Sequence, residues 1–289
     1  MSEEVVQRPE IYREPLSQKQ FGIVEKPLSV FERIYDLSWL RKLFVLVVIA
    51  ALWESYARWL DNELLVPTFS ATVDALIDVA VSGVIFTRAA MSLKVLLMGF
   101  SIGVLVAALL TIFAINTRIG NDFLETMTAM FNPLPAIALL PLALIWFGLG
   151  SASLVFVLVH SVLWAVALNT HAGFRAVSTT HRMVGQNYGL HGLSFVGKIL
   201  IPAAFPSILA GLKIGWAFAW RTLIAAELVF GTTSGQGGLG WFIFEAKNQL
   251  NIPEVFAGLL SIILIGLFVE NVVFRLIEAK TVRRWGMQS

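Results

Sequence analysis

Residues 189–202 read GLHGLSFVGKILIP and lie between two of the most apolar segments of the chain. The stretch is too short and too interrupted by glycine to cross a bilayer, which requires a helix of ~20 mostly apolar residues. Leu193, Val196, Ile199 and Leu200 nevertheless recur at the spacing of an apolar helical stripe. The stretch therefore predicts an amphipathic helix outside the membrane, whose apolar side rests either on lipid headgroups or in a groove of another protein.

The residues on either side of this helix predict a turn before it and a membrane span after it. Gly189 and Gly192 interrupt the segment that precedes the helix, because glycine permits a sharp backbone turn at little steric cost. Pro202 and Pro206 then bracket the start of the next span, where a missing N–H does least harm. We therefore expect an ordered connection over residues 174–204.

The composition indicates an integral membrane protein. The 289 residues are 57% hydrophobic and 14% charged, whereas a soluble domain is nearer half apolar and one quarter charged. The basic residues behind the net charge of +2 are scattered over loops and tails, which indicates membrane topology rather than a nucleic-acid partner. The absence of cysteine excludes disulfides, thiol catalysis and cysteine-bound metals.

Six segments are long and apolar enough to form membrane-spanning helices. They cover residues 43–61, 89–115, 123–147, 151–173, 205–230 and 255–278. We therefore expect an all-α membrane domain over residues 43–278, with an N-terminal tail at 1–42 and a C-terminal tail at 279–289. In the first span, Glu54 and Arg58 lie four residues apart in the favourable acid-first order and are expected to pair.

The distribution of basic residues predicts that both termini are cytoplasmic. With the N-terminus in the cytoplasm, fifteen Lys and Arg residues lie on the cytoplasmic side and three on the other. Residues 64–87 then lie outside, where Ser70 or Thr72 is expected to cap a short helix.

Prolines distinguish the third predicted span. Pro133, Pro135 and Pro141 each remove an N–H and free a carbonyl, in a region where unsatisfied backbone groups are costly. Such breaks persist where neighbours or a water-filled cavity satisfy the freed groups. The span therefore either bends for packing or lines the route of a substrate, with residues 134–140, including Leu139, near its centre.

The fifth predicted span carries Lys213, Arg221 and Glu227. Ionisable groups within spans face protein or water and mark functional sites. Arg221 and Glu227 differ by six positions, roughly 240° round a helix, so each requires another partner. We interpret Arg221 as a cation facing a passing anion or bound to carbonyls of the third span, and Glu227 as a gate or an inter-helix contact. Lys213 alternatively extends toward the cytoplasmic edge.

Pairs of glycines four residues apart occur twice within the predicted spans. Gly99 and Gly103 form one pair, and Gly211 and Gly215 form the other. Such residues let helices approach closely, either within the chain or between two copies of it.

Two further patterns point away from nucleotide and metal sites. GQGGLG at 235–240 matches GxGxxG, but a dinucleotide site needs a strand before the glycines and a helix after them. A span precedes this stretch, so we interpret it as an external turn, a surface for a binding protein. His160, His171, His181 and His191 lack metal-site spacing, and no GxxxxGK[ST] motif occurs.

The opening stretch resembles the loop of ATP-binding-cassette (ABC) importer permeases that docks into the ATPase subunit. That family's pattern is Glu-Ala-Ala, three residues, Gly, nine residues, and Ile-x-Leu-Pro. Gly189, Ile199 and Pro202 keep this spacing, whereas MVG stands at 183–185 and isoleucine precedes the proline. The resemblance implies a helix–turn–helix at 183–202 that transmits movement from the ATPase. Its coupling residues are then Met183, Gly185, Gly189, Leu193, Ile199 and Pro202.

Further segments resemble the permeases of nitrate, sulfonate and taurine importers over residues 40–278. They are NPLPAIALLPLALIWFG at 132–148, GLKIG at 211–215, AAEL at 225–228 and GGLG at 237–240. The resemblance implies a permease homodimer in the bacterial inner membrane, with two ABC ATPase subunits that carry ATP and Mg, and a periplasmic or lipid-anchored solute-binding protein. No cofactor is then expected on this subunit, and the substrate is a small anion or zwitterion: nitrate, taurine or an alkanesulfonate.

We predict a translocation path that includes Pro135, Leu139, Pro141, Arg221 and Glu227. Two other classes of protein remain as alternatives. An ion-coupled carrier or channel would work without ATPase subunits. An intramembrane enzyme would need a converging nucleophile–base pair or metal-ligand set, and the sequence offers neither.

Overall fold

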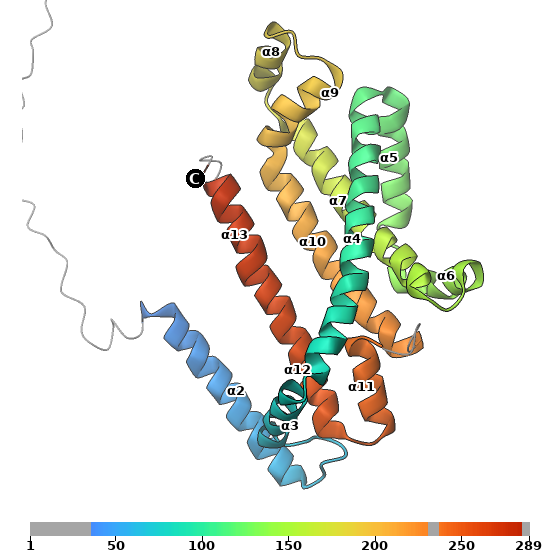
Figure 1. The fold of residues 1–289 in the computed structure, drawn as a ribbon. Coiled ribbons are helices and arrows are strands. Elements are labelled where there is room, and N and C mark those ends of the chain that lie inside the picture. The colour runs from blue at the N-terminus through green and yellow to red at the C-terminus, as the bar shows by residue number, and fades with distance from the viewer. Residues whose placement is uncertain (1–35, 231–236, 285–289) are drawn as a thin grey trace, which may run out of the picture. The chain divides into compact units, whose positions relative to one another are not determined.

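The structure is a computed structural model that describes residues 36–230 and 237–284. All regular secondary structure within these residues is helical (Figure 1). The chain divides into two compact units, Met1–Leu52 and Trp53–Ser289. In the first unit, the described part is essentially the beginning of helix α2 (Ser38–Leu60). The second unit contains the remaining helices.

Five helical segments are long and apolar enough to cross a membrane. They are α2, α4 (Val84–Asn116), α7 (Ser151–Ala176), the run from Gly192 to Val229, and the run from Ile252 to Arg283. A sixth crossing is available if one bent pair of helices counts as a single broken span. The pair consists of α5 (Arg118–Phe131) and the segment Ala136–Phe147, which meet at 90°.

Helices continue through the boundaries predicted at residues 205 and 278. The predicted loop helix and the fifth span form one continuous run of α9 (Gly192–Phe195), a π-helical turn η3 (Val196–Leu200) and α10 (Ile201–Phe230). Pro202 is the second residue of α10 and lies directly after the π-helical turn, inside the continuous run. Pro206 lies inside the helix rather than ahead of it.

The last span also continues beyond its predicted end at residue 278. It consists of α12 (Ile252–Phe268), η4 (Val269–Phe274), α13 (Arg275–Glu278) and η5 (Ala279–Arg283). The predicted C-terminal tail therefore begins within a helix. Polar residues of this last turn, such as Lys280 and Arg283, ended the hydropathy signal without ending the helix.

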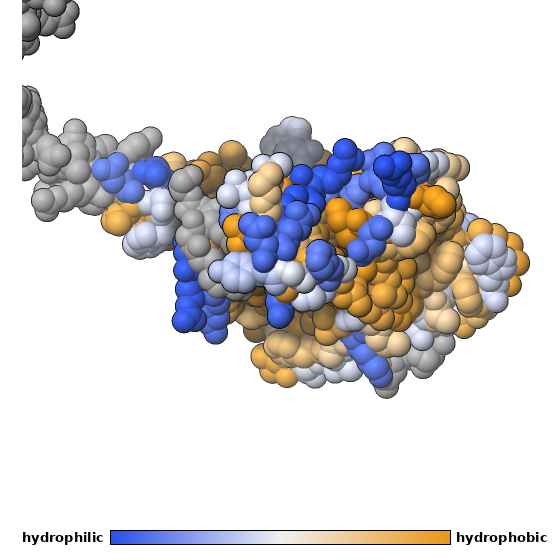
Figure 2. All heavy atoms as spheres, turned by 90° about the horizontal axis from the view of Figure 1, so that it is seen from above, coloured by the Kyte–Doolittle hydropathy of each residue, from blue (hydrophilic) through white to orange (hydrophobic). Residues whose placement is uncertain are grey.

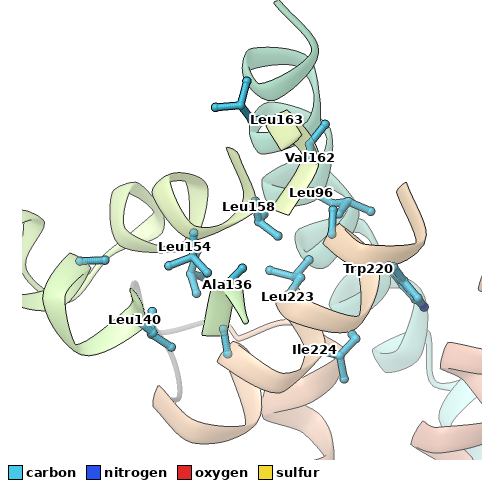
Figure 3. Packing of buried hydrophobic residues seen from close by; sticks show 14 of the residues in the cluster. Leu96, Ala136, Leu140, Leu154, Leu158, Val162, Leu163, Trp220, Leu223 and Ile224 are labelled. Atoms are coloured by element: carbon cyan, nitrogen blue, oxygen red, sulfur yellow. The ribbon is translucent and has the colours of Figure 1, made fainter. Parts of the chain in front are cut away.

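Helix α7 is the central helix of the second unit, between α4 and α10. Its buried leucines and valines pack against Leu96 of α4 and Leu223 of α10 (Figure 3). Ala136 and Leu140, which follow the bend of the broken span, join the same cluster. The two helices on either side of α7 therefore share one apolar core with the segment after the bend.

Both glycine pairs are used in packing against α7 of the same chain. A Cβ on Gly99 would lie 2.5 Å from Leu158 Cβ, and one on Gly103 would lie 2.8 Å from Val162 Cβ. Gly211 and Gly215 of α10 likewise approach α7, at Val166 and Asn169. Small residues thus let three helices pack closely. The interpretation of these glycines as a contact between two copies is wrong, because α7 already covers them.

The predicted external segment contains α3 (Phe69–Val81), whose cap differs from the prediction. Thr68 is the N-cap and its hydroxyl accepts a hydrogen bond from the Ala71 N–H, so neither Ser70 nor Thr72 has this role. The N–H and hydroxyl of Ser70 instead donate to Glu54, at 3.1 and 3.0 Å. Glu54 also pairs with Arg58 at 2.6 Å, which confirms the predicted ion pair.

The ends of the second unit differ in the elements they carry. One end holds α8 (Thr179–Asn187), α9 and the turn between α4 and α5 (Figure 1). The other holds α3 and α11 (Leu239–Asn248). Figure 2, which looks down on the α8 end, shows hydrophilic residues gathered there and hydrophobic residues along the flanks. Exposed leucines and isoleucines on the sides of α4 and α12 fit a lipid-facing surface.

Candidate translocation path

The broken span bends where prolines remove two helical donors. Pro133 and Pro135 follow the end of α5, and neither can donate a backbone hydrogen bond. The Phe131 carbonyl accepts instead from the Leu134 N–H at 3.1 Å. A 3₁₀ turn η2 (Ala136–Leu139) then starts α6 (Leu140–Phe147) in a new direction. The prolines thus end α5 within the predicted span 123–147, and the bend of 90° far exceeds the kink considered for it.

Leu139 and Pro141 lie after this bend. Pro141 occupies the first turn of α6, so it removes no helical hydrogen bond, contrary to the prediction for this proline. Leu139 ends η2 and is partly buried against the core. Neither residue lines the cavities described below.

A cavity of about 350 Å³ lies at the bend. One wall is residues 131–137, and the facing walls come from α7 and α10. Pro135 and Arg221, two residues of the predicted path, line it together. Ser161 of α7 and Thr222 of α10 join the two helices here through their hydroxyls, 3.0 Å apart. The bend therefore creates a space between three segments that are distant in the sequence.

Arg221 provides the positive charge of this cavity. Its Nε donates to the Ala217 carbonyl of its own helix at 3.0 Å, rather than to a carbonyl freed by the prolines. The guanidinium carbon lies 5.3 Å from the ring centroid of Phe218, a cation–π arrangement. No Asp or Glu is among the lining residues of the cavity. The site is therefore positively charged.

Two further polar side chains of the cavity were missed in the sequence. His160 and Trp164 lie one helical turn apart on α7, and both line the cavity. Their ring nitrogens are buried and, among the described residues, have no hydrogen-bond partner. Phe131 stacks on Trp164 with ring centroids 5.4 Å apart and meets His160 edge-on. The spacing of four residues between His160 and Trp164 could have predicted that both lie on the same face of the span.

Two more cavities continue from the bend along α5 and α7. The second, of about 300 Å³, shares Asn132 and Pro133 with the first. The third, of about 420 Å³, shares His171 with the second and ends beside Arg118 and Arg175. Arg118 begins α5, so this third cavity lies at the α8 end of the unit. Neighbouring cavities thus share lining residues, and the three follow one another from the bend toward that end.

Glu227 lies apart from the cavities, in a buried contact between helices. Its carboxylate accepts hydrogen bonds from the Ser92 hydroxyl of α4, at 2.8 Å, and from the Gly240 N–H of α11, at 2.9 Å. The Leu239 N–H donates to the same Ser92 hydroxyl at 2.9 Å. Of the two interpretations of Glu227, the structure places it in an inter-helix contact.

Two glycines at the start of α11, Gly238 before it and Gly240 within it, make this contact possible. A Cβ on Gly238 would overlap Ser92 Oγ, and one on Gly240 would lie 2.6 Å from Glu227 Cβ. Gly240, the last glycine of the GxGxxG pattern, and its neighbour Gly238 therefore serve close packing around a carboxylate. Gly235 lies outside the described residues.

The predicted loop is a helical hairpin made by α8 and α9. Gly189 ends α8 with φ +70°. Its N–H donates to the Gln186 carbonyl and the Leu190 N–H donates to the Gly185 carbonyl, the paired bonds of a Schellman motif. Gly192 also has a positive φ, of +55°. The two glycines thus provide the backbone conformations that the predicted turn requires.

Packing inside the hairpin leaves an apolar surface outside it. A Cβ on Gly185 would lie 2.8 Å from the Phe195 ring and 2.9 Å from Ile199, so α8 rests directly on the following helix. Val196 and Leu200 are buried, whereas Leu193, from the same predicted stripe, is 71% exposed. Four large apolar side chains of the hairpin are exposed: Met183, Val184, Tyr188 and Leu193.

Lys213 of α10 forms an ion pair instead of extending to a membrane surface. Its Nζ donates to Glu278 of α13 at 2.7 Å. Arg283 approaches the same carboxylate at 3.9 Å. The pair therefore links the fifth and last spans near their α8 ends.

Comparison with known proteins identifies the family. Residues 99–284 match the family described as binding-protein-dependent transport system inner membrane component. MJ0413 of Methanocaldococcus jannaschii, described as an ABC transporter permease, is 31% identical over 76% of this chain and 83% of its own length. The aliphatic sulfonates transport permease SsuC of Escherichia coli is 29% identical over 77% of this chain and 84% of its own length.

A nitrate import permease is also similar. NrtB of Synechocystis is 30% identical over 62% of this chain and 64% of its own length. The match and the helices together confirm the predicted all-α membrane class and a multi-pass location in the inner membrane. The chain belongs to the binding-protein-dependent family of ABC importer permeases.

Proposed function

We propose that two copies of this permease form the path of an ATP-driven importer for a small anion or zwitterion, such as nitrate, taurine or an alkanesulfonate. The observation that carries the proposal is the cavity at the bend, with Arg221 as its charged group and no carboxylate in its lining. The relatives described as sulfonate and nitrate permeases support the same class of substrate.

The series of cavities supports a route along α5 and α7. It leads from Pro135 and Arg221 past His171 to the basic residues at the α8 end. Leu139 and Pro141 stand beside the bend and contribute by fixing its direction. Glu227 contributes from a distance, by tying α10 to α4 and α11.

The hairpin of α8 and α9 is the proposed contact with two ABC ATPase subunits, which bind the ATP and Mg. Its exposed apolar side chains exceed what an isolated hairpin in water would retain. A partner groove would cover Met183 and Leu193. Gly185 and Ile199 pack α8 against the following helix, and Gly189 forms the turn between them. Pro202 lies at the start of α10. Movement of the ATPases would then reach α10 directly, because α9 and α10 are continuous.

The α8 end is proposed to be cytoplasmic. Arg118 at the start of α5, Arg175 in the last turn of α7 and Arg182 of α8 lie at this end, which agrees with the positive-inside rule. Both termini are then cytoplasmic, with residues 1–42 as the N-terminal tail. The opposite end, with α3 and α11, would face the external solute-binding protein, periplasmic or lipid-anchored.

Co-purification and uptake test this function. The tagged permease should retain two ATPase subunits in detergent, and proteoliposomes should accumulate substrate only with ATP and the solute-binding protein. The alternative, an ion-coupled carrier or channel, predicts uptake from the permease alone. Accumulation driven by an ion gradient without ATPase subunits would overturn the proposal.

A further inference from the structure

One ion pair joins the two helices that enclose the second and third cavities. Arg175 of α7 donates from Nη1 to Glu125 Oε1 of α5 at 2.6 Å. It is the one hydrogen bond between α5 and α7 in the described part of the chain. The side chains are 62% and 50% exposed, and an ion pair of such exposed groups contributes little to stability. The pair is therefore a link between two helices that opens at low cost.

The pair lies at the boundary between these two cavities. Glu125 lines the second cavity, Arg175 lines the third, and His171 lines both. A solute that follows the proposed route from the bend to the α8 end therefore passes the pair.

The charges along this route give the pair a meaning for an anion. Glu125 is the one carboxylate that lines the first two cavities. Without a partner it would repel an anion at close range, because charges are screened less between protein walls than in water. The first cavity is positive through Arg221, and the third has Arg118 and Arg175 against Asp122. Arg175 thus neutralises a carboxylate that stands between two positive cavities.

We propose that the Glu125–Arg175 pair is a charge-selective gate, which a passing anion opens by replacing Glu125 as the partner of Arg175. The inference rests on the proposed function and adds a gating step to its route. Arginine carries several N–H donors, and Arg175 uses one of them here. An anion can therefore bind the free donors before Glu125 leaves. A cation would meet Arg221 on one side of the pair and Arg118 on the other, so the exchange is unfavourable for it.

Thiol modification tests the gate, because the chain has no cysteine of its own. Asn132→Cys places a reporter thiol beyond the pair, where the first and second cavities meet. Asn121→Cys places a control thiol before the pair, in the third cavity. The probes are sulfonatoethyl methanethiosulfonate, an anion, and trimethylammonioethyl methanethiosulfonate, a cation.

The reagents are added to membrane vesicles that carry the permease with its ATPase subunits, in the orientation in which Asn121→Cys reacts faster. The measured quantity is the modification rate of Asn132→Cys divided by that of Asn121→Cys, for each reagent. This ratio reports passage past the pair and cancels differences in access to the α8 end.

Three further changes in both reporter chains separate a gate from a structural ion pair. Glu125→Met leaves Arg175, so the ratio for the anion should rise about tenfold, the scale of one charge at close range in a partly exposed site, and the ratio for the cation should not rise. Arg175→Met leaves Glu125, so the ratio for the cation should rise and that for the anion should fall. The double change, Glu125→Met with Arg175→Met, removes the pair without leaving a charge, so both ratios should rise. Gel filtration checks that each variant is folded.

Two results would overturn the gate. Equal ratios in the wild type and the double variant would show that the pair does not restrict passage. The same shift for both reagents in each single variant would show that passage does not depend on charge. ATP-driven uptake by the wild type is measured separately, and its absence would contradict the importer function alone, whereas uptake together with unchanged ratios would contradict only the gate.

Discussion

Gly189 ends α8 in the left-handed region, at φ +70°, and a Cβ there would meet no atom within 4 Å. Replacement by valine therefore costs backbone strain alone, without a steric clash. A left-handed conformation costs an L-residue ~1–2 kcal/mol, and a β-branched side chain belongs at the upper end. About 2 kcal/mol changes the equilibrium of the turn roughly thirtyfold. Gly189→Val should thus disturb the hairpin while leaving the spans intact.

Two variants isolate this effect. Gly197 also has open space around its Cβ position but no positive φ, so Gly197→Val shares the entropic effect of removing a glycine without the strain. Gly189→Asn keeps a residue that tolerates the left-handed region. In proteoliposomes, Gly189→Val should reduce ATP-driven uptake about tenfold at unchanged permease content, and both controls should stay near wild type. Equal uptake by Gly189→Val and Gly197→Val would refute the role of the turn.

Three further predictions concern packing and buried hydrogen bonds. Gly240→Ala should lower the free energy of unfolding by ~1–3 kcal/mol, because its Cβ would lie 2.6 Å from atoms of α10. Gly266→Ala is the control, since a Cβ on Gly266 has no neighbour nearer than 3.6 Å. Equal thermal midpoints for the two variants would contradict this prediction. Ser92→Ala should lower the free energy of unfolding by ~1–3 kcal/mol, because it leaves the buried Glu227 carboxylate and the Leu239 N–H without this partner. Thr111→Ala should cost less, since the Thr111 hydroxyl donates to a carbonyl of its own helix. Thermal midpoints of the two variants test this order. Gly103→Leu should force α4 away from α7 and abolish the monodisperse gel-filtration peak, so a normal peak would refute the close contact.

The number of crossings was predictable because lipid imposes long apolar helices on any chain that crosses it. The turn of the hairpin was also predictable, because Gly189 and Gly192 marked it in the sequence. Both adopt the positive φ values that favour glycine. The boundaries at residues 205 and 278 were not, because hydropathy ends where the polar region begins, whereas a helix continues as long as its hydrogen bonds do.

The arrangement of the site was less accessible. Prolines at 133 and 135 predict that a helix ends but not the direction of the chain afterwards, so the 90° bend and its cavity were missed. Glycine pairs predict close contact without naming the partner, which is α7. Glu227 and the glycines at the start of α11 were both noticed in the sequence, but the hydrogen bond between Glu227 and Gly240 depends on where the chain lies after residue 236.

The unbroken course of α10 has a consequence for the order of events in transport. Arg221 and Glu227 lie six residues apart on it, about 9 Å along the axis at 1.5 Å per residue. A tilt of α10 that widens the space around Arg221 would also move Glu227 relative to Ser92 and Gly240, to which it is hydrogen-bonded. Release of the solute on one face and closure on the opposite face would then occur together, because one rigid helix connects the two sites.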